Sequence, residues 1–146
     1  MLRSVHVVVP AKINLHLKVN EKRDDGFHDI ESIFQKIPLY DELLIEMADT
    51  KNTCKVDSPV FKLPEKNTLT SAYSAFCAAT GISVGVNVAL TKHIPSGAGM
   101  GGGSSDAAGM LRGLQQLFGV SLTDAELKKA AETIGSDVPF FLYNGA

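Results

Sequence analysis

The chain has 146 residues, of which 45% are hydrophobic, and this is enough to form one ordinary core within a single domain. A net charge of −2 argues against a polybasic surface for nucleic acid or acidic lipid. No apolar run has the length of a signal peptide or a membrane span. Cys54 and Cys77 lack the spacing of a metal site, so we expect two free thiols in a cytoplasmic protein, with a disulfide as the alternative.

The first half of the chain is typical of β-structure. Residues 4–10 are rich in β-branched side chains, and residues 13–19 alternate apolar and polar positions. Residues 20–26 end in Asp-Gly, a pair that favours reversal of the chain. Residues 27–37 and 42–47 then predict two further strands.

The second half mixes helices with strands. Apolar residues at helical spacing predict a helix over 67–81 that ends at Gly81, and residues 84–92 return to the period of a strand. A second helix covers 106–119, with Ser104 or Ser105 as its cap.

A third helix begins at Thr123, where Glu126 completes a capping box, and ends at Gly135. Residues 137–143 predict a final strand. The order of elements predicts an α+β domain of two layers, with helices on one face of a mostly antiparallel sheet.

Residues 95–109, PSGAGMGGGSSDAAG, contain six glycines among fifteen residues and lie between a predicted strand and a predicted helix. Glycines let backbone N–H groups approach an anion, and the helix N-terminus adds a partial positive charge. The pattern therefore predicts a loop that binds phosphate. The expected contacts are Pro95, Ser96, Gly97, Ala98, Gly99, Met100, Gly101, Gly102, Gly103, Ser104 and Ser105.

Three other interpretations of this loop fit the sequence less well. Residues 97–102 match G-x-G-x-x-G, but a dinucleotide fingerprint opens a parallel sheet, whereas here a strand-rich segment precedes it. A Walker loop requires a lysine after the glycines, and none follows. A flexible turn without a ligand would leave the ordering entropy of the glycines without compensation.

Four segments carry a resemblance to a known family: PAKINLHLKV, RDDGFHDIESIFQ, PSGAGMGGGSSDAAG and GSDVPFFL, in this order between Pro10 and Leu142. They resemble the family of galactokinase, homoserine kinase, mevalonate kinase and phosphomevalonate kinase, the GHMP kinases. The resemblance implies a fold shared with a domain of ribosomal protein S5, and the use of ATP and Mg²⁺ to phosphorylate an alcohol. Within this family, the chain most resembles the members that act on a cytidine diphosphate alcohol in isoprenoid precursor synthesis.

The resemblance also implies a catalytic pair. Asp137 matches the proposed base of related kinases, and we expect Pro139 to hold Val138 extended so that Asp137 is presented rigidly. Lys12 is placed beside Asp137, where it would lower the pKa of the attacking hydroxyl, and Asn14 follows on the same strand face as a substrate contact. The residues alone favour the ordinary interpretations, in which Asp137 is a turn residue and Lys12 a solvated lysine.

Two further pairs of residues are matched to the bases of the substrates. Phe27 and His28 would stack on and read the cytosine, although family members commonly have a tyrosine where Phe27 stands. Asn67 and Lys92 match contacts on the adenine side. The alternatives are a core phenylalanine, an exposed loop histidine, a helix N-cap for Asn67 and a solvated strand end for Lys92.

Two departures from the family pattern bear on function. No magnesium-holding carboxylate is identifiable, so no metal ligand is assigned. Family members continue into a second domain, so residues 1–146 are interpreted as the N-terminal ATP-binding domain without its C-terminal partner. We expect this chain alone to be inactive and to expose apolar surface near residues 138–143. The alternatives are a kinase of the mevalonate or homoserine type and a non-catalytic binding module; no oligomeric state is predicted.

Overall fold

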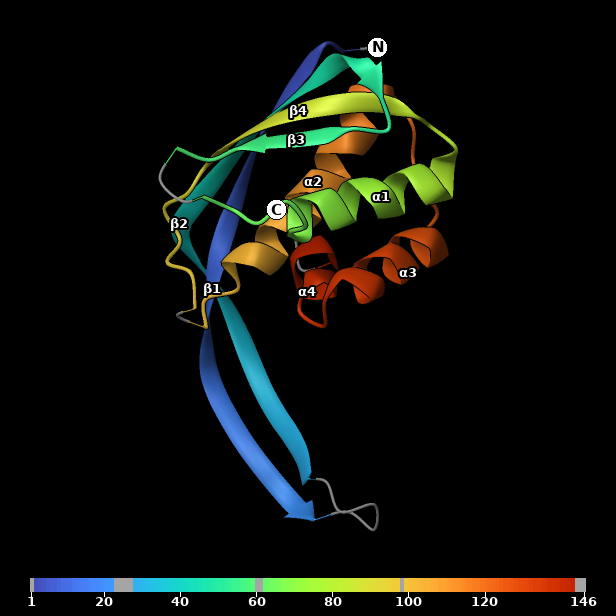
Figure 1. Ribbon diagram of the computed structural model, residues 1–146. Helices are drawn as coiled ribbons and strands as arrows, with labels where there is room; N and C mark the ends of the chain where they lie inside the picture. The colour runs from blue at the N-terminus through green and yellow to red at the C-terminus, as the bar shows by residue number, and fades with distance from the viewer. Residues whose placement is uncertain (1, 23–27, 60–61, 98, 144–146) are drawn as a thin grey trace.

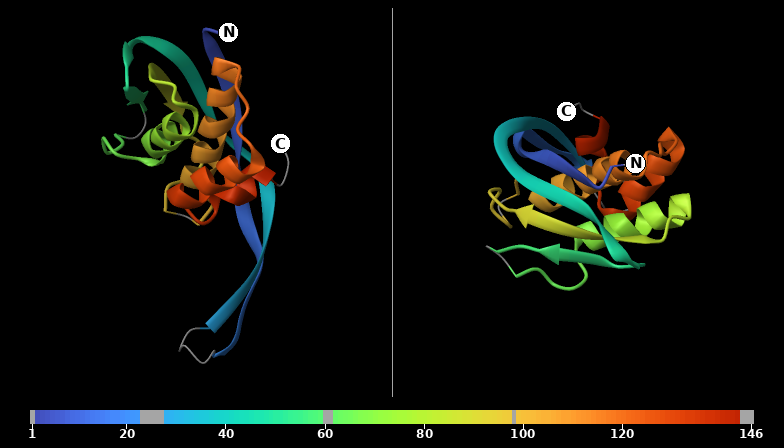
Figure 2. Two further views of the ribbon diagram at one scale, coloured as in Figure 1. Left: turned by 90° about the vertical axis from the view of Figure 1, so that its right-hand side faces the viewer. Right: turned by 90° about the horizontal axis from the view of Figure 1, so that it is seen from above.

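The computed structural model describes residues 2–22, 28–59, 62–97 and 99–143, with residues 16–22, 28–32 and 143 described by their backbone alone. A four-stranded sheet in the order β1-β2-β4-β3 carries the helices on one face, as Figures 1 and 2 show. The expected α+β fold with a mostly antiparallel sheet is confirmed, because two of the three strand pairs are antiparallel and one is parallel.

Two long strands form the first hairpin. β1 (Ser4–Lys22) pairs antiparallel with β2 (His28–Lys51), and each strand joins two segments that the sequence predicts as separate strands. A register shift between Pro10 and Ala11 lets β1 continue past the proline, which is how β-bulges extend interrupted strands. The far end of this hairpin extends beyond the helical layer (Figure 1).

Two shorter strands complete the sheet. β4 (Val84–Thr91) pairs antiparallel with β2, as its alternating pattern predicts. β3 (Cys54–Asp57) pairs parallel with β4 and is not predicted from the sequence. Four residues carry too short a pattern to indicate a strand.

Helix boundaries follow the capping residues. α1 (Thr68–Thr80) begins after Asn67, whose side chain accepts from two backbone amides, and ends at Gly81 with φ 76°. α3 (Asp124–Ile134) has the predicted capping box of Thr123 and Glu126, and its C-cap is Gly135. These signals are confirmed because each supplies the hydrogen bonds that a helix end lacks.

The predicted cap of α2 is wrong. α2 (Gly102–Phe118) begins after Gly101, which adopts φ 70° and makes no side-chain cap, so Ser104 and Ser105 lie inside the first turn. The glycines themselves continue into the helix, and the start of α2 is therefore open to an external acceptor.

The predicted final strand is also wrong, because Val138–Tyr143 form the short helix α4. Val138 and Phe141 are buried, and their spacing of three residues matches a helix. Pro139 lies in the first turn, where a missing N–H costs nothing. Asp137 is consequently a turn residue before a helix, and the expected extended Val138 is not found.

The core lies between the sheet and the helices. Gly109 and Gly113 let α2 pack close to β1 and β2. A Cβ at Gly109 would overlap the side chain of Val9, and a Cβ at Gly113 would stand 2.5 Å from Ile45 Cδ1. Val138 and Phe141 belong to this core, and Phe140 and Leu142 pack against it, so these four described side chains do not form the expected exposed apolar surface. The exposed large apolar side chains lie mainly on β1 and β2: Val8, Ile13, Leu15, Ile33, Tyr40 and Leu44.

Candidate nucleotide and phosphoryl-transfer site

The glycine-rich loop encloses a cavity of about 390 Å³ at the start of α2. Gly97, Gly99 and Gly101 adopt φ values of 73°, 72° and 70°, which side chains rarely tolerate. A left-handed residue next to an ordinary one can turn successive N–H groups toward one side, which is the geometry of an anion nest. The lining residues are Thr68, Lys92, Pro95, Ser96, Gly97, Gly99, Met100, Gly101, Gly102, Gly103 and Ser104.

The sequence-predicted loop residues are therefore brought together, with two exceptions. Ala98 lies outside the described residues. Ser105 is fully buried rather than lining the cavity, and its Oγ has no hydrogen-bond partner. The cavity and the uncapped start of α2 together favour an anion, because the helix N-terminus contributes unpaired donors and a partial positive charge.

Lys12 is buried against this loop and is not a solvated strand lysine. Its side chain is 4% exposed, and its backbone N–H donates to Met100 O at 2.9 Å, so β1 is tied directly to the loop. Nζ donates to Asn14 Oδ1 at 3.2 Å and lies 4.3 Å from the centre of the Phe34 ring. The ammonium is therefore held by an amide and an aromatic face, and the lysine stem lies against the glycine-rich loop, with Cγ 3.1 Å from the position of a Cβ at Gly101.

Asp137 lies in the turn between α3 and α4 and is partly exposed. Among the described residues, no hydrogen bond or ion pair joins it to Lys12. α4 nevertheless reaches the same region: a Cβ at Gly101 would stand 2.9 Å from Phe141 Cζ and 3.1 Å from Lys12 Cγ. The Phe140 ring packs edge-on against Phe34 at 5.2 Å, so α4 and the lysine share aromatic neighbours.

Asn67 and Lys92 line a second, smaller cavity of about 240 Å³ beside the first, together with Ser96 and Asp106. Asn67 acts as the N-cap of α1, with Oδ1 accepting from Leu69 N at 2.9 Å. Lys92 is 9% exposed, so its interpretation as a solvated strand end is wrong.

Lys92 is held by two carboxylates that the sequence analysis does not single out. Nζ donates to Asp41 Oδ2 at 2.6 Å and to Asp106 Oδ2 at 3.2 Å, and both acidic side chains are buried. Asp106 Oδ1 has no hydrogen-bond partner. Strand alternation with Leu43 and Ile45 could have placed Asp41 on the inner face of the sheet, but not beside Lys92.

The two carboxyl groups beside Lys92 differ in their pKa and therefore in their charge at neutral pH. Burial, with Asp41 beside it, raises the pKa of Asp106 to about 8 against the pull of Lys92. Burial also opposes ionisation of Asp41, but hydrogen bonds from Asp106, Lys92 and the amides of Ile94 and His93 outweigh it and lower its pKa. Asp41 and Lys92 are therefore the charged pair at neutral pH, and Asp106 retains a proton.

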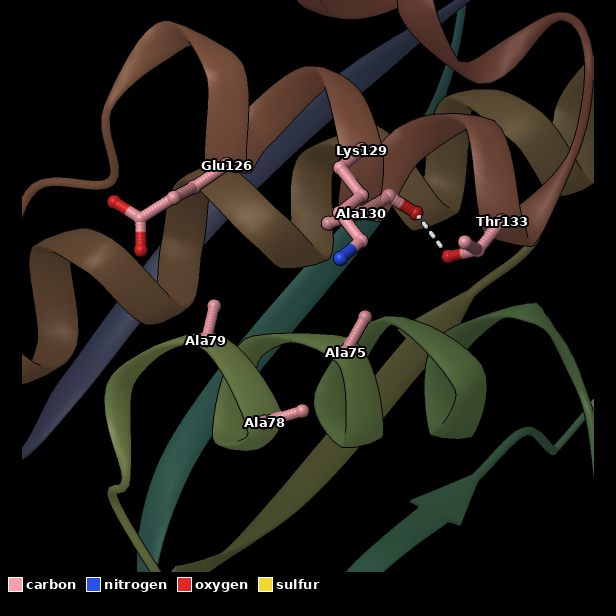
Figure 3. Close-up of a pocket in the computed structure, with 7 residues that line it drawn as sticks. All are labelled: Ala75, Ala78, Ala79, Glu126, Lys129, Ala130 and Thr133. Carbon is pink, nitrogen blue, oxygen red and sulfur yellow. Dashed lines mark hydrogen bonds between the residues drawn. The ribbon is translucent and has the colours of Figure 1, made fainter.

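The expected contacts to a cytosine base are not located. Phe27 lies outside the described residues, and His28 is described as the first residue of β2, paired with Lys22, without its side chain. Elsewhere, a groove of about 400 Å³ between α1 and α3 is lined by Ala75, Ala78 and Ala79 across from Glu126 and Lys129 (Figure 3). It contains none of the predicted site residues.

A metal site is not found among the described residues, since no group of three histidine, cysteine or acidic side chains could hold an ion. The donors available at the cavity, backbone amides and a lysine, suit phosphate oxygens rather than a cation. Among the described helices, none combines the length and apolar character that a membrane crossing requires.

The fold and the glycine-rich loop are shared with a known protein family. The family model described as GHMP kinases N terminal domain matches residues 67–145, more than half of the chain, and the chain belongs to this family. It is similar to 4-diphosphocytidyl-2-C-methyl-D-erythritol kinase of Treponema pallidum (strain Nichols), with 48% identity over 99% of this chain and 50% of the relative. The protein of the same name from Thermotoga maritima is 46% identical over 97% of this chain and 51% of its own length.

Solved structures agree with this assignment. A crystal structure of 4-(cytidine 5'-diphospho)-2C-methyl-D-erythritol kinase superposes with a TM-score of 0.82 at 38% identity, over 96% of this chain and 49% of that one. Homoserine kinase from Cytophaga hutchinsonii has a TM-score of 0.65 at 21% identity, over 100% of this chain and 44% of that one, and so shares the fold. The chain spans about half the length of the curated relatives that it matches.

Proposed function

We propose that this chain is the nucleotide-binding part of a kinase that transfers the γ-phosphoryl group of ATP to a hydroxyl of 4-diphosphocytidyl-2-C-methyl-D-erythritol, in the non-mevalonate synthesis of isoprenoid precursors. The observation that carries the proposal is the cavity formed by three left-handed glycines at the uncapped start of α2, with buried Lys12 against it. The relatives at 41–48% identity, which bear this enzyme's name, support the choice of substrate.

The loop supplies the first requirement of phosphoryl transfer, a cradle for the phosphates. Backbone N–H groups of residues 99–104 are suited to the β- and γ-phosphates because they add no charge that would hold the product. Asn67 and Lys92 border the smaller cavity, which we assign to the adenine side of the nucleotide. Mg²⁺ accompanies ATP in this proposal, and no side chain is assigned to it.

Lys12 and Asp137 supply the second requirement, activation of the attacking hydroxyl. Lys12 stabilises negative charge on the acceptor oxygen and on the transferred group, because its ammonium is shielded from water. Asp137 accepts the proton of the hydroxyl, and Asn14 orients the acceptor from the same strand face as Lys12. The partly exposed position of Asp137 leaves it accessible to a substrate that enters from solvent.

Recognition of the cytidine group is assigned to Phe27 and His28 at the far end of the first hairpin. We also propose that a second domain, of the size that the relatives have in their other half, closes over the site and supplies an aromatic ring opposite Phe27. One ring covers a single face of a base, so a second ring would improve both affinity and discrimination. A cytoplasmic location completes the proposal, because ATP is the phosphoryl donor.

Binding experiments on the full-length product of the gene that encodes this sequence separate the proposed kinase from a non-catalytic RNA-binding module. A non-catalytic RNA-binding module would bind RNA with an affinity that falls steeply with salt. A kinase binds ATP, and its affinity for the cytidine diphosphate alcohol is unchanged by competing RNA. Calorimetry with ATP and filter binding with RNA over a salt series test the choice; tight RNA binding without ATP binding contradicts the proposal.

A further inference from the structure

The segment that leaves β4 and begins the glycine-rich loop is held by a single carboxylate from another strand. Asp41 Oδ1 accepts from the backbone N–H groups of His93 at 2.7 Å and Ile94 at 2.9 Å. Oδ2 of the same carboxylate accepts from Lys92 Nζ at 2.6 Å. Three consecutive residues are therefore bound to one side chain that comes from β2, about fifty residues earlier in the chain.

This segment forms the support of the nucleotide cavity. Gly102, the first residue of α2, packs directly on it: a Cβ there would stand 2.9 Å from Lys92 Nζ and 3.1 Å from Ile94 Cγ2. Lys92 also reaches Asp106 in the next turn of α2 at 3.2 Å. A shift of residues 92–94 would consequently move the helix N-terminus that receives the phosphates.

Asp41 itself does not contact either cavity. Its side chain is completely buried, and it is absent from the lining of both the larger and the smaller cavity. Any effect of Asp41 on a ligand must therefore act through Lys92, His93, Ile94 and the helix that rests on them.

We propose that Asp41 is a positioning residue for the nucleotide: it fixes the start of the glycine-rich loop to the sheet and so sets the place of the α2 N-terminus. This inference rests on the proposed binding of ATP at the loop. Buried hydrogen bonds to charged acceptors are strong and directional, so a carboxylate that accepts from Lys92, His93 and Ile94 restricts the arrangement of the segment.

The test compares substitutions at Asp41 with a matched core variant in the full-length gene product. Asp41→Asn keeps an oxygen for the two amides but loses the charge that holds Lys92, and Asp41→Leu loses both. Ile45→Val, on the same face of the same strand and fully buried, is the control for a general loss of stability.

We expect Asp41→Asn to raise the Kd for ATP by about tenfold or more, the scale for losing one charge-assisted hydrogen bond. The KM for the alcohol should stay within about twofold, and Asp41→Leu should bind ATP more weakly than Asp41→Asn where it folds. Hydrogen exchange at residues 93 and 94 should accelerate in the Asp41 variants and remain unchanged in Ile45→Val. An unchanged Kd in Asp41→Asn, or an equal increase in Ile45→Val, overturns the inference.

The two proposals can fail separately. If the wild-type protein does not bind ATP, the proposed function fails, and the exchange of the two amides alone decides whether Asp41 holds the segment. If the wild type binds ATP and Asp41→Asn binds it equally well, the proposed function stands and the positioning role is overturned.

Discussion

Gly101 lies against the ring of Phe141, so the last residue before α2 and the interior face of α4 are in direct contact. A Cβ at Gly101 would stand 2.9 Å from Phe141 Cζ, in a residue whose φ is 70°. The glycine is therefore required twice, once by the backbone conformation and once by the close approach of a ring. This contact links the glycine-rich loop to the segment that carries Asp137.

The first prediction separates these two requirements. Gly101→Ala introduces both left-handed strain of about 1–3 kcal/mol and overlap with Phe141. Gly119→Ala introduces the strain alone, because Gly119 has φ 64° and open space around its Cα, at the opposite end of α2. We expect both variants to be destabilised, Gly101→Ala more, and ATP binding to weaken in Gly101→Ala alone. Thermal unfolding and calorimetry check this; equal ATP affinities in the two variants would contradict the placement of the loop.

A second prediction concerns Lys12 and Asp137 as a catalytic pair. Asp137→Asn should lower kcat by about a hundredfold or more, the scale for a lost general base. Because the two groups act on one hydroxyl, the double variant with Lys12→Met should lose little more than the worse single variant. Steady-state kinetics of the three variants provide the cycle. Additive losses, or a nearly normal rate in Asp137→Asn, would rule out the pairing.

The cluster at Lys92 makes folding stability depend on pH. Asp106 has a folded pKa of about 8, whereas an unfolded aspartate has a pKa of about 4, so the folded state binds the extra proton between these values. Its contribution to stability is therefore greatest at low pH and is lost as the pH rises through about 8. Asp106→Asn cannot ionise and should remove this component from the pH dependence of the unfolding midpoint. Parallel pH profiles in wild type and Asp106→Asn would contradict the assignment.

The two cysteines should be unreactive in the folded protein. Burial, with Cys77 nearby, raises the pKa of Cys54 to about 12, and burial raises the pKa of Cys77 despite its hydrogen bond to Tyr73. The thiolate is the reactive form, so modification by a disulfide reagent at pH 7.5 should be slow and should become rapid in denaturant. Rapid modification of either thiol in the native protein would show that these side chains are not enclosed.

Local signals predict much of this fold because they act over a few residues. Asn67, Gly81 and the Thr123–Glu126 box determine the ends of α1 and α3 through hydrogen bonds within one turn. The strand predicted over 137–143 is wrong because a short, mostly apolar segment fits either period. Its helical state depends on burying Val138 and Phe141 against elements distant in the sequence.

The candidate site shows the same division. The glycine-rich loop is apparent from the sequence because its composition marks it, whereas Lys12 is singled out only by the family resemblance. Asp41 and Asp106 are ordinary acidic residues in the sequence, and their relation to Lys92 arises from a strand pairing and a helix start that no local pattern specifies. Long-range contacts of this kind need the fold before they can be recognised.

The most direct test of the proposed function is phosphoryl transfer from radiolabelled ATP to a panel of alcohols by the full-length gene product. We expect label to appear on 4-diphosphocytidyl-2-C-methyl-D-erythritol, with at most trace transfer to mevalonate or homoserine. The product should be a phosphate monoester formed with one equivalent of ADP. Preferential transfer to mevalonate or homoserine, or no transfer to any alcohol by protein that binds ATP, would contradict the account.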